Sequence, residues 1–241
     1  RKASGELLSQ RLFWPAWAGI AALVMSLAVG AVGLAPLLTF TLGGFAAGAA
    51  LRQLALATRR QGLRGLVGRA NGGMVVHIGV IIIAVALAAS NSYTRSQEIT
   101  LTVGKPAQYG GHSFEFVRFV EEKDDRRISV KAEIIIDGSG TYAPAIQKFI
   151  NMGQNIGTPS VKSMFTKDIY LTLQPPVKVS TNTAKIKVFI KPLMMWLWIG
   201  GGVMAFGTLL AVFPGRRRNP LDAVSAPLSM EPPKEPTGVT P

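Results

Sequence analysis

The chain of 241 residues contains no cysteine. This absence excludes disulfide bonds, thiolate chemistry and covalent attachment of a c-type haem to the chain itself. Acidic residues are also scarce, because 13 Asp and Glu stand against 26 Lys and Arg and leave a net charge of +13. Such an excess can indicate nucleic-acid binding. Here, however, the basic residues lie beside long apolar runs, which favours signals of membrane topology and argues against nucleic acid as a partner.

Four apolar segments have the length of membrane-spanning helices. Each holds about 20 residues, enough to cross about 30 Å of hydrocarbon at about 1.5 Å per residue. The segments cover residues 13–33, 36–56, 72–90 and 192–213. A soluble chain of this size could not bury four such runs. We therefore predict an α-helical membrane protein with four transmembrane helices, the first two forming a helical hairpin over residues 13–56.

The basic residues predict an orientation. Lys and Arg occur before the first span, in the loop 57–71 and directly after the last span, whereas the turn between the first two spans is uncharged. By the positive-inside rule, residues 1–12, 57–71 and 214–241 are expected in the cytoplasm, and 91–191 outside it. The proline-rich tail is expected to be disordered. Because the chain begins with Arg1 rather than Met, we expect a fragment or a processed product.

Residues 91–191 show the alternation of β-strands. β-branched or aromatic residues occupy alternate positions, and glycine and proline separate the runs. The runs are 98–103, 113–120, 128–136, 168–173 and 184–190. We predict an inserted all-β extracytoplasmic domain, a small sandwich or open barrel. A loop or short helix is expected at 142–165, and a solvated hairpin tip at 121–127.

One histidine interrupts the third apolar segment. His77 lies in GMVVHIGVIIIAVALAAS, and an imidazole without a partner in hydrocarbon costs several kcal/mol. It could bond a neighbouring helix, relay protons, or ligate a metal or haem iron. The four spans contain no Asp or Glu to continue a proton relay, and no second His, Cys or carboxylate to complete a zinc site. The structural and the haem interpretations stay open on the residues alone.

Two stretches carry a resemblance to a known family. They are NGGMVVHIGVIIIAVALAASNSY and VFIKPLMMWLWIGGGVMAFGTLLAVFPGRRR, with VGKPAQYGGHSFEF and DIYLTL between them. Together they resemble the C-terminal third of the CcmF proteins, haem-lyase membrane subunits of cytochrome c maturation that are related to NrfE. The resemblance covers about residues 60–218.

The resemblance implies a function. Such proteins accept haem from a haem chaperone and attach it to apocytochrome c, with thiol-reducing and docking subunits as further partners. They also hold a b-type haem that is thought to take electrons from quinol. His77 is in the position of one axial ligand of that haem, and Arg69 is a candidate contact for a haem propionate. The second ligand and the tryptophan-rich haem site are expected outside this chain, and no catalytic residue is assigned within it.

Two further expectations complete the sequence-based hypothesis. The resemblance implies a multi-pass location in the bacterial cytoplasmic (inner) membrane, and the fragment alone is not expected to be active. His112, in the turn GGHSF, is interpreted as a surface residue rather than an external haem ligand. The alternative function is a non-catalytic membrane-anchored β-domain, acting as a sensor or an assembly scaffold, in which His77 is purely structural.

Overall fold

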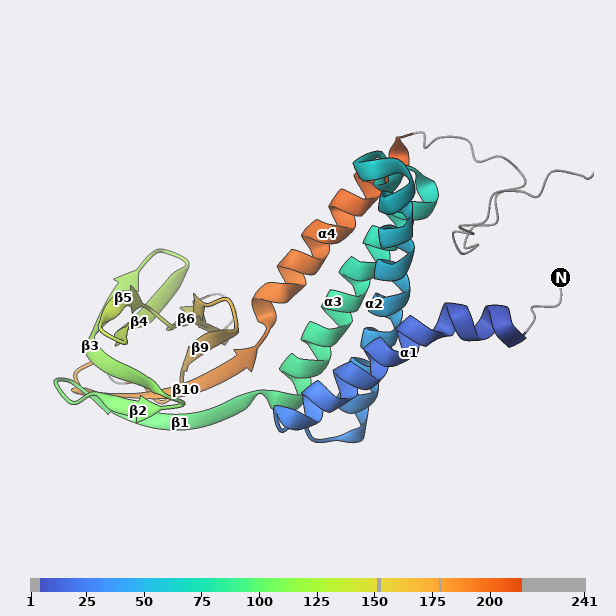
Figure 1. Cartoon of the computed structure of the whole chain (residues 1–241). Helices are drawn as coiled ribbons and strands as arrows, with labels where there is room; N and C mark the ends of the chain where they lie inside the picture. The colour runs from blue at the N-terminus through green and yellow to red at the C-terminus, as the bar shows by residue number, and fades with distance from the viewer. Residues whose placement is uncertain (1–4, 151–152, 178, 214–241) are drawn as a thin grey trace, which may run out of the picture.

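The computed structural model describes residues 5–150, 153–177 and 179–213. Within these ranges, long helices precede and follow a β-rich region, which confirms the predicted fold class (Figure 1). The helices are α1 (Gly5–Ala28), α2 (Leu34–Gln61), the short 3-10 helix η1 (Gly62–Leu66), α3 (Arg69–Tyr93) and α4 (Met194–Val212). In the described part of the chain, four helical segments are long and apolar enough to cross a membrane.

The ends of the helices differ from the expected ends. α1 stops at Ala28, and the turn that follows uses positive φ angles of 82° at Gly30 and 100° at Gly33. α2 continues to Gln61, because Arg and Gln favour the helix even beyond the apolar segment. The segment 57–71 is largely helical, because most of it belongs to α2, η1 and α3; its cytoplasmic location stays a prediction. The expected disordered tail, 214–241, lies outside the described residues.

Two glycine pairs hold α3 and α4 together. A Cβ atom placed on Gly79 would lie 2.7 Å from the carbonyl oxygen of Gly200, and one on Gly207 would lie 3.0 Å from that of Gly72. The pairs stand seven residues apart on each helix, which keeps them on one face. The antiparallel backbones therefore approach more closely than any larger residue would allow, as is typical of small residues at membrane helix interfaces.

Helix α2 packs against both α1 and α3. A Cβ on Gly44 would clash with the Cβ of Ala22 in α1, so these two helices are also in close contact. On α2, Gly43 faces Ile81 and Val85 of α3. α1 and α3 are thus both positioned by glycines of α2.

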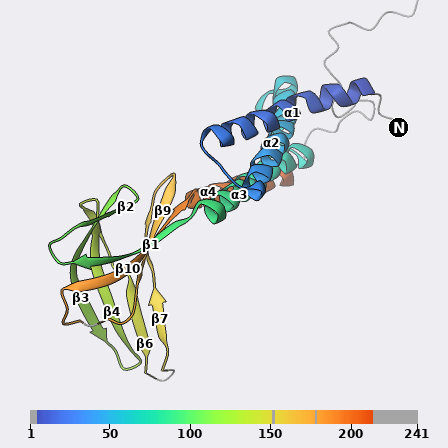
Figure 2. The same ribbon diagram turned by 90° about the horizontal axis from the view of Figure 1, so that it is seen from below.

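The β-rich region between α3 and α4 consists of two antiparallel sheets (Figure 2). One sheet has the order β1-β10-β9-β8, and the other has the order β2-β3-β4-β6-β7, with β5 paired to β4. The strands are β1 (Arg95–Thr102), β2 (Ala107–Tyr109), β3 (His112–Lys123), β4 (Arg127–Ile136), β5 (Ser139–Tyr142), β6 (Ala145–Phe149), β7 (Asn155–Thr158), β8 (Ser160–Ser163), β9 (Lys167–Leu173) and β10 (Thr183–Pro192). All five runs predicted from alternation coincide with strands.

The core of this β-domain draws on both sheets. Phe114, Phe116 and Ile134 from one sheet and Leu171 and Ile186 from the other are almost completely buried. These positions alternate along their strands, as expected for residues that face a core. The expected loop or short helix at 142–165 was wrong, because this part of the chain contains β6, β7 and β8.

The β-domain is joined to the helices by very short connections. Only Thr94 separates α3 from β1, and only Leu193, at a left-handed φ of 58°, separates β10 from α4. β1 and β10 pair with each other directly, with Arg95 opposite Ile190. The α3–α4 pair thus continues into a β1–β10 pair without a loop (Figure 1).

Candidate functional site

His77 lies in the third turn of α3, and its side chain is exposed in this structure. Gly73, Val80, Ala84 and Leu87 share this side of the helix, because residues three, four and seven apart lie on one face. We call these five residues the open stripe of α3. His77 supplies the only polar side chain of the stripe.

The other sides of α3 are covered. Gly72 and Gly79 contact α4, whereas Ile81 and Val85 face α2. Asn71 adds a 3.4 Å hydrogen bond from the side chain of Gln53 in α2. The open stripe is therefore what remains after both neighbouring helices have packed against α3.

Gly73 leaves space beside the imidazole. A helical side chain leans toward the N-terminus of its helix, so that of His77 leans over the turn that contains Gly73. A Cβ atom on Gly73 would meet no atom of the described residues within 4 Å. A flat ligand can therefore approach His77 without a clash from its own helix.

Neither ring nitrogen of His77 has a hydrogen-bond partner among the described residues. In hydrocarbon this would cost several kcal/mol, so the stripe requires a polar or metal-bearing partner. The described residues contain no cluster of three or more potential metal ligands. A metal that is held mainly by its own macrocycle, such as haem iron, fits this donor set because it needs only axial ligands from the protein.

Arg69 is the first residue of α3 and is also exposed. It lies eight positions before His77, which corresponds to about 12 Å along the helix axis. The structure therefore places both predicted site residues on one helix, with Arg69 two turns nearer the linker to α2. They are not in contact with each other.

His112 is not a surface residue, and that expectation was wrong. Its relative exposure is 9%, and its Nδ1 atom lies 2.8 Å from Oδ2 of Asp137. An ionised carboxylate only accepts hydrogen bonds, so Nδ1 donates to Asp137. Nε2 is buried and has no partner in the described part of the chain. Burial follows from strand parity, since His112 shares its face of β3 with the core residues Phe114 and Phe116.

Asp137 is the centre of a small polar network at the end of β4. It accepts hydrogen bonds from His112, from the backbone N–H of Ser113 at 3.0 Å and from Nζ of Lys162 at 3.1 Å. These bonds, that of His112 first, hold the pKa of the Asp137 carboxyl well below its usual range. The network fastens β3, β4 and β8 to one another.

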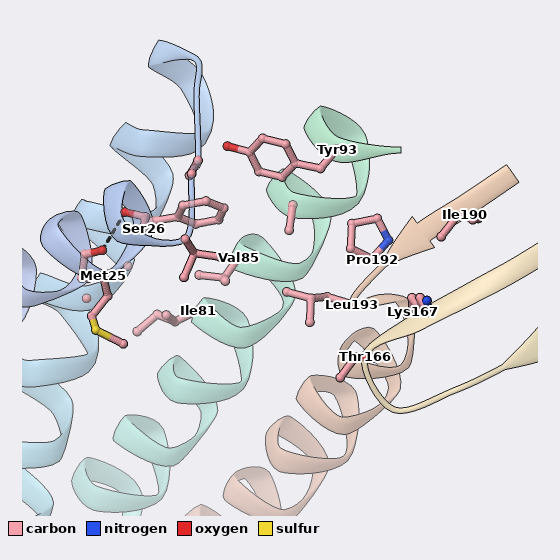
Figure 3. A pocket seen from close by; sticks show the side chains of 18 of the residues that line it. Met25, Ser26, Ile81, Val85, Tyr93, Thr166, Lys167, Ile190, Pro192 and Leu193 are labelled. Atoms are coloured by element: carbon pink, nitrogen blue, oxygen red, sulfur yellow. Dashed lines mark hydrogen bonds between the residues drawn. The ribbon is translucent and has the colours of Figure 1, made fainter. Parts of the chain in front are cut away.

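Sequence reasoning missed one further feature, a cavity of about 910 Å³ where the helices meet the β-domain (Figure 3). Its walls come from α1, α2, α3 and the strands β1, β9 and β10. No local pattern could have indicated it, because residues far apart in the sequence form it together.

Comparison with known proteins confirms the resemblance inferred from the sequence. The chain is 29% identical over 151 residues to "Cytochrome c-type biogenesis protein CcmF" of Haemophilus influenzae, which covers 61% of this chain and 23% of that protein. It is 26% identical over 151 residues to the protein named NrfE of the same organism, again over 61% of this chain and 24% of the relative. A solved structure, "Cytochrome c Heme Lyase CcmF", matches with a TM-score of 0.73 and 25% identity, over 89% of this chain and 36% of its own. No family model matches the chain.

Two statements follow from these matches. The chain is similar to CcmF and NrfE proteins over 61–89% of its length, and it is a multi-pass membrane protein. It spans about a quarter of the length of the two curated relatives named above.

Proposed function

We propose that this chain is part of a membrane haem lyase that attaches haem to apocytochrome c, and that His77 is an axial ligand of a b-type haem. The printed names of the relatives support the general activity. The observation that carries the specific role is the exposed, unpartnered imidazole on the open stripe of α3, with Gly73 beside it.

The residues of the chain would act in distinct ways. His77 donates a nitrogen lone pair, which requires the neutral imidazole. Gly73 keeps the approach to that nitrogen free of side-chain atoms. Arg69 carries a fixed positive charge two turns away, suited to a propionate. The second axial ligand is proposed to come from polypeptide outside these residues, as the family resemblance implies.

Bound haem would supply one-electron chemistry, with quinol as the proposed donor. The chain contributes an apolar environment that excludes water from the haem, because Val80, Ala84 and Leu87 make the stripe around His77 apolar. A water-excluding apolar shell disfavours the more highly charged ferric state and so raises the potential of the iron. The remaining proposed partners are a haem chaperone, apocytochrome c and the thiol-reducing and docking subunits of the maturation machinery.

The proposed orientation places the α2–α3 linker in the cytoplasm and the β-domain outside the bacterial inner membrane. Arg59, Arg60, Arg64 and Arg69 all lie at the linker end of the helices, as the positive-inside rule requires. His77 would then lie nearer the cytoplasmic side of the membrane than its centre.

The test is the visible absorption spectrum of the intact haem lyase, including the polypeptide that supplies the second axial ligand, purified in detergent from its native membrane. We expect a b-type spectrum that sharpens on reduction with dithionite and is lost in His77→Gly. Added imidazole should restore part of it, because the free ligand can enter the space that the side chain leaves. The matched control is His112→Gln, which removes the chain's other histidine and should leave the spectrum unchanged.

Two results would contradict the proposal. One is a folded but colourless intact parent protein. The other is a His77→Gly variant whose spectrum equals that of the parent. Either result would favour the alternative function, a membrane-anchored scaffold in which His77 has a structural role.

A further inference from the structure

The cavity between the helices and the β-domain has the shape of a groove. α1 and α3 both pack on α2, and the small residues Gly43, Gly44 and Ala47 of α2 form its floor. Figure 3 shows Met25 of α1 on one side, with Ile81 and Val85 directed toward it from α3. Its volume of about 910 Å³ lies within the usual range of ligand pockets, about 300–1,000 Å³.

The groove extends over half of the membrane-spanning length. Its lining residues on α3 run from Ile81, the central residue of this 25-residue helix, to Tyr93 at its end. Twelve residues of helix cover about 18 Å. One leaflet of a bilayer contributes about 15 Å of hydrocarbon, half of the total. The groove therefore matches the depth of a single leaflet, on the side of the β-domain.

The two ends of the groove differ in chemistry. The deep end is lined by apolar and small side chains, among them Met25, Ile81 and Val85. At the other end Arg95 of β1 and Lys167 of β9 line the cavity, next to Thr166. No acidic side chain is among the lining residues. Neither Arg95 nor Lys167 forms a salt bridge within the described residues.

Two cations that form no salt bridge, placed at the mouth of an apolar groove, are complementary to an amphipathic anion. A neutral lipid would leave both charges uncompensated, and a small soluble anion would leave the apolar groove unfilled. Each Lys or Arg near a membrane surface contributes about 1 kcal/mol toward binding anionic lipid. His77 does not line the groove, so this site is separate from the proposed haem ligand.

We propose that the groove between α1 and α3 binds one anionic phospholipid from the leaflet on the β-domain side, with an acyl chain along Ile81 and Val85 and the phosphate at Arg95 and Lys167. The bound lipid completes the packing between α1, α3 and the start of α4. The proposal does not depend on the haem-related function, because it uses none of the same residues.

The test places the full chain in nanodiscs with equal amounts of phosphatidylglycerol and phosphatidylcholine, transfers it to detergent, and measures retained lipid by native mass spectrometry. We expect one phosphatidylglycerol molecule per chain in preference to phosphatidylcholine. Removing each cation should lower that preference about fivefold, so Lys167→Gln and Arg95→Gln together should largely abolish it. The matched control is Lys148→Gln, an exposed lysine of β6 that does not line the groove.

A second variant tests the apolar part. Ala47→Phe should fill the groove floor and lower the retention of phosphatidylglycerol in protein whose circular dichroism matches the parent. Addition of inorganic phosphate should not displace the lipid, since phosphate alone cannot use the groove. Equal retention of both lipids by the parent would overturn the proposal. An unchanged preference in the double cation variant, or displacement of the lipid by inorganic phosphate, would do so too.

Discussion

The Nδ1 atom of His112 lies 2.8 Å from Oδ2 of Asp137, at the point where β3 begins and β4 ends. Asp137 adopts a left-handed backbone conformation with φ of 55°, followed by Gly138 at 67°. This turn directs the carboxylate back toward β3, where it also accepts the N–H of Ser113. The pair therefore fixes the start of one core strand to the end of the next.

We expect Asp137→Asn to lower the stability of the β-domain by about 1–2 kcal/mol, a value reduced for the partial exposure of the carboxylate. The folded pKa of Asp137 lies below its unfolded value, so its contribution is present above the unfolded pKa. It is lost as the pH falls through the folded pKa. Thermal unfolding from pH 7 to below pH 2, followed by circular dichroism, measures both effects.

The control for this experiment is Asp125→Asn in the β3–β4 turn, an exposed carboxylate without an ion pair among the described residues. It should leave the unfolding temperature unchanged. If Asp137→Asn retained the full acid sensitivity of the parent, Asp137 would not be the group responsible.

A second prediction compares two glycines on the same helix. Gly79→Ala places a Cβ atom 2.5 Å from Cγ of Met204 and 2.7 Å from the carbonyl oxygen of Gly200, so α3 and α4 must separate. Overpacking of this kind costs about 1–3 kcal/mol. Gly73→Ala meets nothing and should be neutral or slightly stabilising, because alanine favours the helix by about 1 kcal/mol. Thermal unfolding in detergent distinguishes the two, and equal effects would contradict the described α3–α4 interface.

A third prediction concerns the space beside His77. Gly73→Leu should leave the helices intact but obstruct the approach to the imidazole, so haem content should fall severalfold while unfolding stays close to that of the parent. Leu87→Ala, at the far end of the open stripe, is the matched control and should keep its haem. The ratio of visible to ultraviolet absorbance reports the haem content, and an unaltered ratio in Gly73→Leu would count against haem on this face.

Much of the fold could be predicted because its signals are local. Length and hydropathy located the four membrane helices, and alternation located β1, β3, β4, β9 and β10. The strands β6, β7 and β8 have only four or five residues each, too few for alternation to be distinguished from an irregular loop. Their pairing in the two sheets, rather than their own sequence, makes them strands.

The site was predicted only in part for a related reason. His77 is conspicuous because it is a single polar group in an apolar run, which a sequence displays directly. The burial of His112 had a weaker signal, the period of two that it shares with Phe114 and Phe116. Arg95 and Lys167 gave no signal, since only the pairing of β1 with β10 and of β10 with β9 brings them to one cavity.

Thr94 and Leu193 are the only residues between the membrane helices and the β-domain, so no long flexible linker joins the two parts. Trp196 of α4 adds a contact between the helices and the β-domain, because its indole N–H donates to the carbonyl oxygen of Phe165 and the two rings lie 5.2 Å apart. A force applied to the β-domain is therefore transmitted directly to α3 and α4. Because His77 lies on α3, a tilt of this helix would move the imidazole as well.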